Sequence, residues 1–217
     1  DGQTIRSQIN GDHTYITGNV WKNQQQGVAN PTGVQSLDIE GYASSVAEDI
    51  TVTHNTFIDN RYGPCISVRG GTNAKARLTI HNNILVNCGG TALVGFEQAA
   101  MVFENYADVG NTHSIKNNII YDPAQTNAVY YKASGLTTVA AFQSACSGDV
   151  CSGNLASDPL LRSTTDFRVQ LSSPARRAGI SGVCADVRGR VCSPDAPHIG
   201  AYQSTSGDPA ATRTARQ

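Results

Sequence analysis

The sequence carries little charge and no excess of either sign. Charged residues make up only 15% of the 217 residues, and 16 Lys and Arg stand against 17 Asp and Glu. A near-neutral chain lacks the basic surface with which proteins bind nucleic acid or an anionic membrane. No apolar run approaches the about 18–20 residues of a membrane span. We therefore expect neither nucleic-acid binding nor a transmembrane segment.

Methionine and tryptophan are also scarce. The only Met is Met101, and Asp1–Asn10 has neither the basic nor the apolar region of a signal peptide. We therefore expect this chain to be a processed or truncated form. What is abundant is glycine, with 21 residues, and asparagine, with 16, while 39% of the residues are hydrophobic. This composition is typical of a folded protein rich in strands and turns, not of a helical bundle or a disordered chain.

The six cysteines predict disulfides. Their spacing favours three local pairs, Cys65 with Cys88, Cys146 with Cys151, and Cys184 with Cys192. A metal site is the weaker interpretation, because the close pairs are five and eight residues apart and no His stands at a ligand interval. Disulfides form in oxidising compartments, so the sequence predicts a secreted, periplasmic or cell-surface protein.

An internal repeat runs through the first 122 residues. In four segments an apolar residue precedes an Asn by three positions, a second apolar residue follows it by two, and Asn or Asp follows by four. The segments are Ile16–Asn23, Val52–Asp59, Ile80–Asn87 and Ile115–Asp122, and they centre on Asn19, Asn55, Asn83 and Asn118. The central asparagines are separated by 36, 28 and 35 residues.

The register continues beyond each Asn. Apolar or aromatic residues stand eleven and thirteen positions later, at Ile66 and Val68, Val94 and Phe96, and Val129 and Tyr131. The residues between and after them alternate to polar or small types, which predicts a strand with one inward face. Leu37–Glu40 shows the same alternation after a longer loop. Short strands at this spacing indicate a solenoid of stacked coils, in which we expect the central asparagines to form a hydrogen-bonded ladder.

These repeats resemble those of right-handed parallel β-helix proteins of the pectate-lyase-like superfamily. The blocks "ITVTHNTFIDN", "LTIHNNILVN" and "SIKNNIIYD" are similar to its coil repeat. The second half resembles the C-terminal ending of secreted bacterial β-helix proteins, including its closing motif, which reads His198-Ile-Gly-Ala-Tyr202 here. In addition, "CISVRGG" is similar to a strand of alginate and chondroitin lyases, with Arg69 at the Arg position and Gly70 in place of His. The resemblance implies a fold and is loose for activity.

The expected fold class is therefore all-β: a right-handed parallel β-helix (solenoid) with a short helix and a C-terminal cap. Residues 1–136 would form the coils, and residues 137–203 a short helix, with Thr137 or Thr138 as its N-cap, and the cap of the same domain. Residues 204–217 would be a disordered tail. Since solenoids need capped ends, we expect either that N-terminal coils are missing or that another subunit covers the open N-terminal end.

The outward side chains of the coils carry the predicted site, because the inward ones form the core. Stacking places Glu40, Arg69, Glu97 and Lys132 in one row and Asp38, Ser67, Gly95 and Tyr130 in a second. The resemblance implies that a substrate groove lies on this face. A surface ladder of ion pairs without further function is the alternative interpretation.

For a groove, the sequence predicts an acidic-polysaccharide lyase that acts by β-elimination. Arg69 and Lys132 would neutralise a uronate carboxylate or abstract the proton beside it, with Asp38 and Glu40 as further catalytic residues. Glu97, Tyr130, His54 and His81 are the predicted substrate-binding residues. Asp38, Glu40 and Glu97 are a weaker prediction for a Ca²⁺ site.

Two alternatives remain open at this point. Paired carboxylates, Asp38 and Glu40 on one strand or Glu97 on another, admit a glycoside hydrolase. A non-catalytic glycan-binding module or adhesin is the other, in which the charged row is a solvated face. For both histidines, packing in the turns is the alternative to a role in binding.

Overall fold

The computed structural model describes most of the chain between residues 7 and 203. The described ranges are 7–9, 13–22, 35–40, 47–69, 75–90, 98–104, 113–125, 127–131, 135–146, 150–182, 184–193, 195 and 197–203, with backbone alone at 7–9, 40, 47–48 and 75–76. The predicted tail, residues 204–217, lies outside them.

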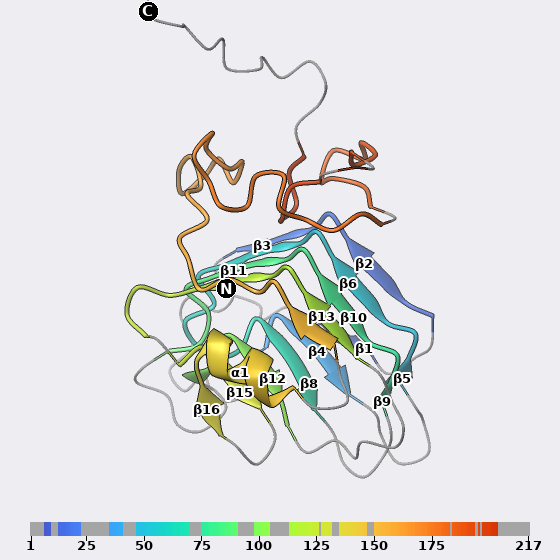
Figure 1. Ribbon diagram of the computed structural model, residues 1–217, viewed down its shortest axis with the longest axis vertical. Coiled ribbons are helices and arrows are strands. Elements are labelled where there is room, and N and C mark those ends of the chain that lie inside the picture. The colour runs from blue at the N-terminus through green and yellow to red at the C-terminus, as the bar shows by residue number, and fades with distance from the viewer. Residues whose placement is uncertain are drawn as a thin grey trace, which may run out of the picture.

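Within the described residues the architecture is all-β, with three mostly parallel sheets and one short helix (Figure 1). Sheet A has the order β1-β4-β8-β12-β15-β16, that is Ser7–Ile9, Leu37–Glu40, Ile66–Arg69, Met101–Phe103, Val129–Tyr131 and the antiparallel Leu136–Thr137. Sheet B has the order β17-β13-β10-β6-β2, that is Val150–Ser152, Ser114–Lys116, Thr79–His81, Thr51–Thr53 and Tyr15–Thr17. Sheet C has the order β14-β11-β7-β3, that is Ile119–Tyr121, Ile84–Val86, Thr56–Ile58 and Val20–Lys22. A two-stranded pair, β5 (Ala47–Glu48) with β9 (Lys75–Ala76), lies between sheets A and B along the chain.

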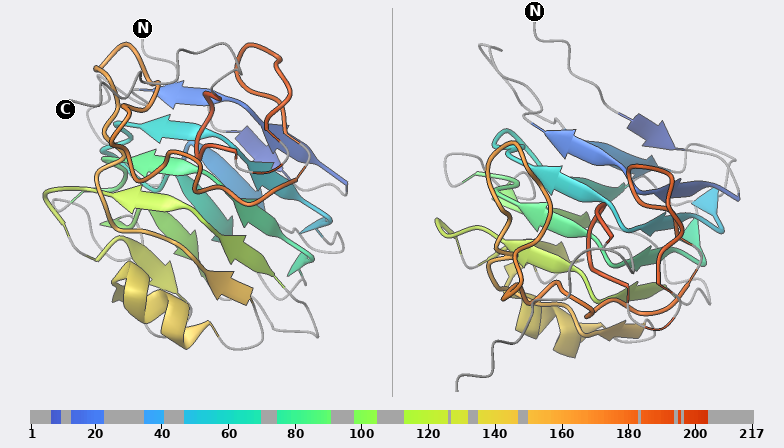
Figure 2. Two further views of the ribbon diagram at one scale, coloured as in Figure 1. Left: turned by 45° about the horizontal axis from the view of Figure 1, so that its top comes forward. Right: turned by 90° about the horizontal axis from the view of Figure 1, so that it is seen from above.

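The chain visits the sheets in the constant order B, C, A, so that each circuit adds one strand to each sheet. Figure 2 shows the successive circuits stacked from blue to yellow. Because the strands pair in parallel and in register, equivalent side chains lie in rows along the stack. This arrangement is compatible with the expected solenoid of coils.

The inward rows form the core. In sheet C the row Trp21, Phe57, Leu85 and Ile120 is in register, and the rings of Trp21 and Phe57 stack with centroids 4.5 Å apart. Rows of Val, Ile, Leu and aromatic residues from sheets A and B complete one buried cluster. Alternation of buried and outward residues along three-residue strands is what the sequence repeat predicts.

The asparagine ladder is present and is longer than predicted. Asn55 Oδ1 accepts from both Asn19 N and Asn19 Nδ2, at 3.0 and 3.1 Å, and the same pair of bonds recurs at each later step. The ladder continues from Asn118 to Asn154, which is not among the four predicted asparagines. Its last amide meets Gln143, whose Oε1 accepts from Asn154 N at 2.8 Å.

The residue before each ladder Asn has a left-handed backbone. Gly18, His54, Asn82, Asn117 and Gly153 have φ between 52° and 70°. Glycine and asparagine adopt this conformation at little cost, and histidine more readily than most residues. The short turn from sheet B to sheet C therefore explains why glycine, asparagine or histidine precedes each ladder Asn.

A helix closes one end of the core. Helix α1 (Val139–Ala145) begins at the N-cap Thr138, whose side chain accepts from Ala141 N at 3.1 Å, as one of the two predicted caps. Its buried Phe142 stacks on Phe103 at 5.5 Å and meets Tyr131 edge-on at 5.2 Å. The three predicted disulfide pairings are confirmed, and Cys146–Cys151 joins the end of this helix to β17.

One predicted strand is corrected. The sequence repeat places the third strand of sheet A at Val94 and Phe96, whereas the structure places β12 at Met101–Phe103, in register with Ile66–Val68 and Val129–Tyr131. The fixed eleven-residue spacing fails because connecting loops vary in length while the stacked strands do not. The Met-Val-Phe segment also forms a better strand than one interrupted by Gly95.

The segment that follows β17 lies along the side of the stack. The backbone of Ile180 exchanges two hydrogen bonds with the side chain of Asn82, Asn117 donates to Ala178 O, and Ala201 N donates to Thr56 Oγ1. Ala175 and Ile199 pack on the outward residues Ile84 and Ile119 of sheet C. This segment, which the sequence assigned to a C-terminal cap, covers the outer face of sheet C and the adjoining turns, as the orange segment of Figure 1 shows.

Candidate functional site

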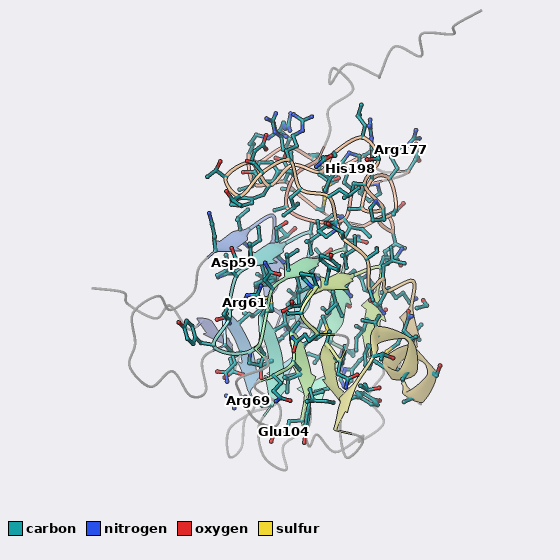
Figure 3. The ribbon with its side chains drawn as sticks, turned by 90° about the vertical axis from the view of Figure 1, so that its left-hand side faces the viewer. Asp59, Arg61, Arg69, Glu104, Arg177 and His198 are labelled. Carbon is teal, nitrogen blue, oxygen red and sulfur yellow. A yellow bond between two sulfur atoms is a disulfide. The ribbon has the colours of Figure 1, made fainter. Side chains whose placement is uncertain are left out.

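The outward face of sheet A brings together part of the predicted site. Asp38, Ser67, Val102 and Tyr130 form one row, and Glu40 and Arg69 stand side by side in the next. The row contains Val102 instead of the predicted Gly95, since β12 takes the place of the predicted strand. In Figure 3, Arg69 and Glu104 lie together at the end of these strands, at the opposite end of the molecule from Arg177 and His198.

Asp38 and Arg69 form a buried ion pair at the centre of this face. Arg69 Nε donates to Asp38 Oδ1 at 3.3 Å, and Nη2 donates to Oδ2 at 2.9 Å. The Asp38 side chain is fully buried, and the Arg69 side chain is 15% exposed. The two residues are diagonal neighbours on adjacent strands, which is a spacing that long side chains span. This bidentate geometry fixes the plane of a guanidinium that stays charged at any physiological pH.

Ser67 provides an unmatched hydroxyl beside this ion pair. It stands directly opposite Asp38 in the register of β4 and β8. Its Oγ is buried and has no hydrogen-bond partner in the part of the chain that the structure describes. Buried hydroxyls normally have a partner, so an unmatched one marks a place where a water or ligand atom fits.

Glu104 takes the place that the sequence assigned to Glu97. Glu104 N donates to Val68 O at 3.1 Å, and the residue follows Phe103, the register partner of Val68. It therefore adjoins Arg69 on the side opposite Glu40, and Glu97 itself lies outside the described residues. The missed signal is the repeated order of apolar, any, apolar and charged residues, which Met101–Glu104 shares with Leu37–Glu40.

The remaining predicted residues of this face are placed only in part. Tyr130 is half-buried in β15, at the end of the row that begins with Asp38. Glu40 is described by its backbone alone, and Glu97 and Lys132 lie outside the described residues. Their predicted roles stay predictions.

His54 lies in the turn from sheet B to sheet C, and His81 is the last residue of β10 in sheet B. His54 is 1% exposed, and its ring nitrogens meet Thr53 Oγ1 at 2.8 Å and Asn82 Nδ2 at 3.1 Å. His81 Nε2 meets Ser114 Oγ at 2.7 Å. The enclosed ring of His54 agrees with the alternative interpretation, packing in the turn, and the role in substrate binding predicted for both histidines stays a prediction.

Both histidines resist protonation. Burial, and secondarily the neighbouring His81, lowers the pKa of His54 to about 4. Burial, and secondarily the ammonium of Lys116, lowers the pKa of His81 to about 4, against a smaller opposite effect of Ser114. Both imidazoles are therefore neutral at neutral pH.

This burial predicts acid sensitivity. The unfolded chain takes up protons on these imidazoles near the ordinary pKa of about 6.5, so the free energy of unfolding falls as the pH drops from about 6.5 to about 4. The variant His54→Asn should keep the turn, since Asn82 occupies the equivalent position with φ 57°, and should recover on the order of 2 kcal/mol of the loss. Urea unfolding at about pH 7 and about pH 4.5 measures this difference.

His13→Asn is the matched control, because the His13 side chain is 75% exposed. It should lose as much stability in acid as the wild type does. An equal acid loss in His54→Asn and the wild type would show that His54 is not the buried acid-sensitive group.

Arg69 engages both oxygens of Asp38, one of the three predicted Ca²⁺ ligands. The side chains of the other two, Glu40 and Glu97, lie outside the described residues, so the Ca²⁺ site stays a prediction. Among the described residues, three side chains lie close enough together to share a metal ion. They are His54, Cys184 and Cys192. These sulfurs are joined in a disulfide and offer no thiolate to a metal.

Comparison with family models, curated proteins and solved structures finds no match for this chain. The class of protein therefore comes from the structure alone. The chain is an all-β protein of stacked parallel strands, with a buried ion pair on the outward face of one sheet. In the described residues, no helix has the length and apolar character needed to cross a membrane.

Proposed function

We propose that the chain is a right-handed parallel β-helix protein of the pectate-lyase-like kind, which acts outside the cell on an acidic polysaccharide by β-elimination. The constant strand order, the parallel register and the asparagine ladder support the fold. The three disulfides support an oxidising compartment.

The observation that carries the proposed activity is the Asp38–Arg69 pair on the outward face of sheet A. Asp38 holds the guanidinium in one orientation, and a fixed guanidinium is the group that best matches a carboxylate. Arg69 would contact the uronate carboxylate and stabilise the negative charge that develops when the neighbouring C–H proton leaves. Since Arg69 stays protonated, the proton acceptor is assigned to Lys132 in its neutral form, and Asp38 becomes a positioning residue. As the C–H electrons form the C=C bond, the glycosidic C–O bond breaks, and the leaving sugar oxygen takes a proton from water.

A glycoside hydrolase is the second candidate, and one observation favours it. Glu40 is the register partner of Arg69, and Glu104 follows β12 on the other side of Arg69, two strands from Glu40. That separation is about 9.6 Å between backbones, near the spacing of the two carboxyl groups in inverting enzymes. Asp38 is a poor partner in such a pair, because it is buried and holds Arg69.

Removing the ion pair as a unit tests the proposal. The double variant Asp38→Asn with Arg69→Gln leaves no buried charge unpaired, and we expect its affinity for polygalacturonate or alginate to fall at least about tenfold. The matched control is Asp166→Asn with Arg168→Gln, which removes an exposed pair of the same bidentate geometry. Titration calorimetry at equal salt measures both. Equal affinities in the two double variants and the wild type would reject a substrate contact at Arg69.

A further inference from the structure

We propose that a second saccharide site, selective for uncharged sugar units, lies between sheet C and the segment that crosses it. A cavity of about 430 Å³ is present there. This volume falls in the range of small-ligand sites, about 300–1,000 Å³. The site is separate from the Asp38–Arg69 face and rests on the proposed function only in taking its ligand to be a glycan.

The floor of the cavity is an outward row of sheet C. Ile58, Val86 and Tyr121 are in register on β7, β11 and β14. Their neighbours Phe57, Leu85 and Ile120 point inward to the core, so the floor is set by the alternation of the strands. The floor is apolar and carries one half-buried aromatic ring, Tyr121.

The opposite wall belongs to residues 158–170 and is fastened to the sheet. Lys22 Nζ donates to Thr164 O at 2.6 Å and lies 5.4 Å from the centre of the Phe167 ring. Phe167 is half-buried and lines the cavity together with Leu160. The pyranose ring of a sugar has apolar C–H faces, and aromatic rings such as Phe167 and Tyr121 bind such faces.

The rim supplies the polar groups that hydroxyls require. Asp59 and Asn87 follow β7 and β11 with left-handed backbones, φ 60° and 54°, and Asn87 Nδ2 donates to Asp59 Oδ1 at 2.8 Å. Asn87 Oδ1 has no hydrogen-bond partner within the described residues. In Figure 3, Asp59 lies at the junction of the strands with the crossing segment.

The charges at the cavity select against an acidic sugar. Among the described residues, its lining contains two carboxylates, Asp59 and Asp158, and no cationic side chain. Lys22 places one ammonium nearby, where it donates to Thr164 O and keeps its charge, so that the two carboxylates outnumber this cation. The other polar lining groups, Ser163, Thr164 and Gln170, are uncharged. A uronate would meet like charge, whereas the hydroxyls of a neutral sugar can donate to the carboxylate and amide oxygens.

Titration of the full chain with neutral trisaccharides tests the site. Cellotriose, xylotriose, mannotriose and galactotriose are the probes, with trigalacturonic acid and the trimer of glucosamine as charged counterparts. We expect at least one neutral trimer to bind, and Phe167→Ala and Asp59→Asn each to weaken that binding about tenfold or more. Calorimetry gives the affinity, and saturation-transfer NMR shows that the sugar ring contacts aromatic protons.

Tyr202→Ala is the matched control, because Tyr202 is a half-buried ring beside Arg188 on the same segment, away from the cavity. It should bind the sugar as the wild type does, and so should the Asp38→Asn, Arg69→Gln variant. The inference is overturned if no neutral trimer binds at up to about 10 mM, if Phe167→Ala and Asp59→Asn leave binding unchanged, or if a charged trimer binds there more tightly. Each of these results leaves the test of the Arg69 face untouched, so the two proposals fail separately.

Discussion

Replacing Arg69 by methionine is expected to lower the free energy of unfolding by about 3–5 kcal/mol. The substitution keeps most of the volume of the side chain but removes the guanidinium from a fully buried Asp38. Without its charged partner, the buried carboxylate is no longer compensated for its lost hydration. This unfavourable free energy is several times larger than the stabilisation that an exposed ion pair provides. Urea or guanidinium unfolding of the two proteins measures the difference.

Two comparisons separate the ion pair from the loss of packing. Arg168→Met should cost less than about 1 kcal/mol, because its pair with Asp166 is exposed on both sides. The double variant Asp38→Leu, Arg69→Met should recover most of the loss of Arg69→Met, since no buried charge remains. If Arg69→Met were as mild as Arg168→Met, the Asp38 carboxylate would not be buried as described.

Substitution of Asn83 by alanine is the second large effect. Asn83 is fully buried, donates to Asn118 Oδ1 and Val52 O, and accepts from Asn55. The substitution leaves several buried groups without partners, each worth about 1–3 kcal/mol. We expect a loss of about 3–4 kcal/mol in the free energy of unfolding, measured by urea denaturation.

The end of the ladder provides the control. Asn19 is exposed and donates to Asn55 without accepting from an earlier rung among the described residues. Asn19→Ala should cost about 1 kcal/mol or less, because water replaces the lost partner. A loss at Asn83 no larger than that at Asn19 would mean that the ladder contributes little to stability.

The stacked strands were predictable because residues of the same type recur at fixed positions in each circuit. An apolar residue three before Asn and a second one two after it mark sheets B and C in four circuits. The fifth ladder residue, Asn154, fits the same spacing with Cys151, Ala156 and Asp158, but Cys151 and Ala156 are smaller than most residues at these positions in the other circuits. Its capping by Gln143 depends on where α1 docks, which no local pattern encodes.

The position of β12 and the packing of the crossing segment were not predictable in the same way. The register of β12 depends on the length of the preceding loop, and several apolar segments compete for one place in the sheet. Ala175 and Ile199, which pack on sheet C, follow no period that would reveal a face. The cavity at Phe167 arises from that packing, so it too was absent from the sequence interpretation.

The face of sheet A was predicted as rows but not as a buried pair. Strand alternation places Glu40 beside Arg69, and the register agrees. Alternation also treats Asp38 as exposed to solvent, whereas it is fully buried and holds Arg69 diagonally. The alternation predicts which side of the sheet a residue faces. It does not predict which other segments cover that side and bury the residue.

The reaction products formed by the purified chain test the proposed function most directly. Polygalacturonate, alginate and chondroitin sulfate would be incubated with it, with and without Ca²⁺, and near-ultraviolet absorbance and reducing ends would be read together. β-Elimination leaves an unsaturated uronide that absorbs in the near ultraviolet, so we predict that both signals rise on an acidic polymer. Reducing ends without absorbance would contradict elimination and favour a hydrolase using Glu40 and Glu104. Neither signal on any polymer would contradict catalysis by this chain.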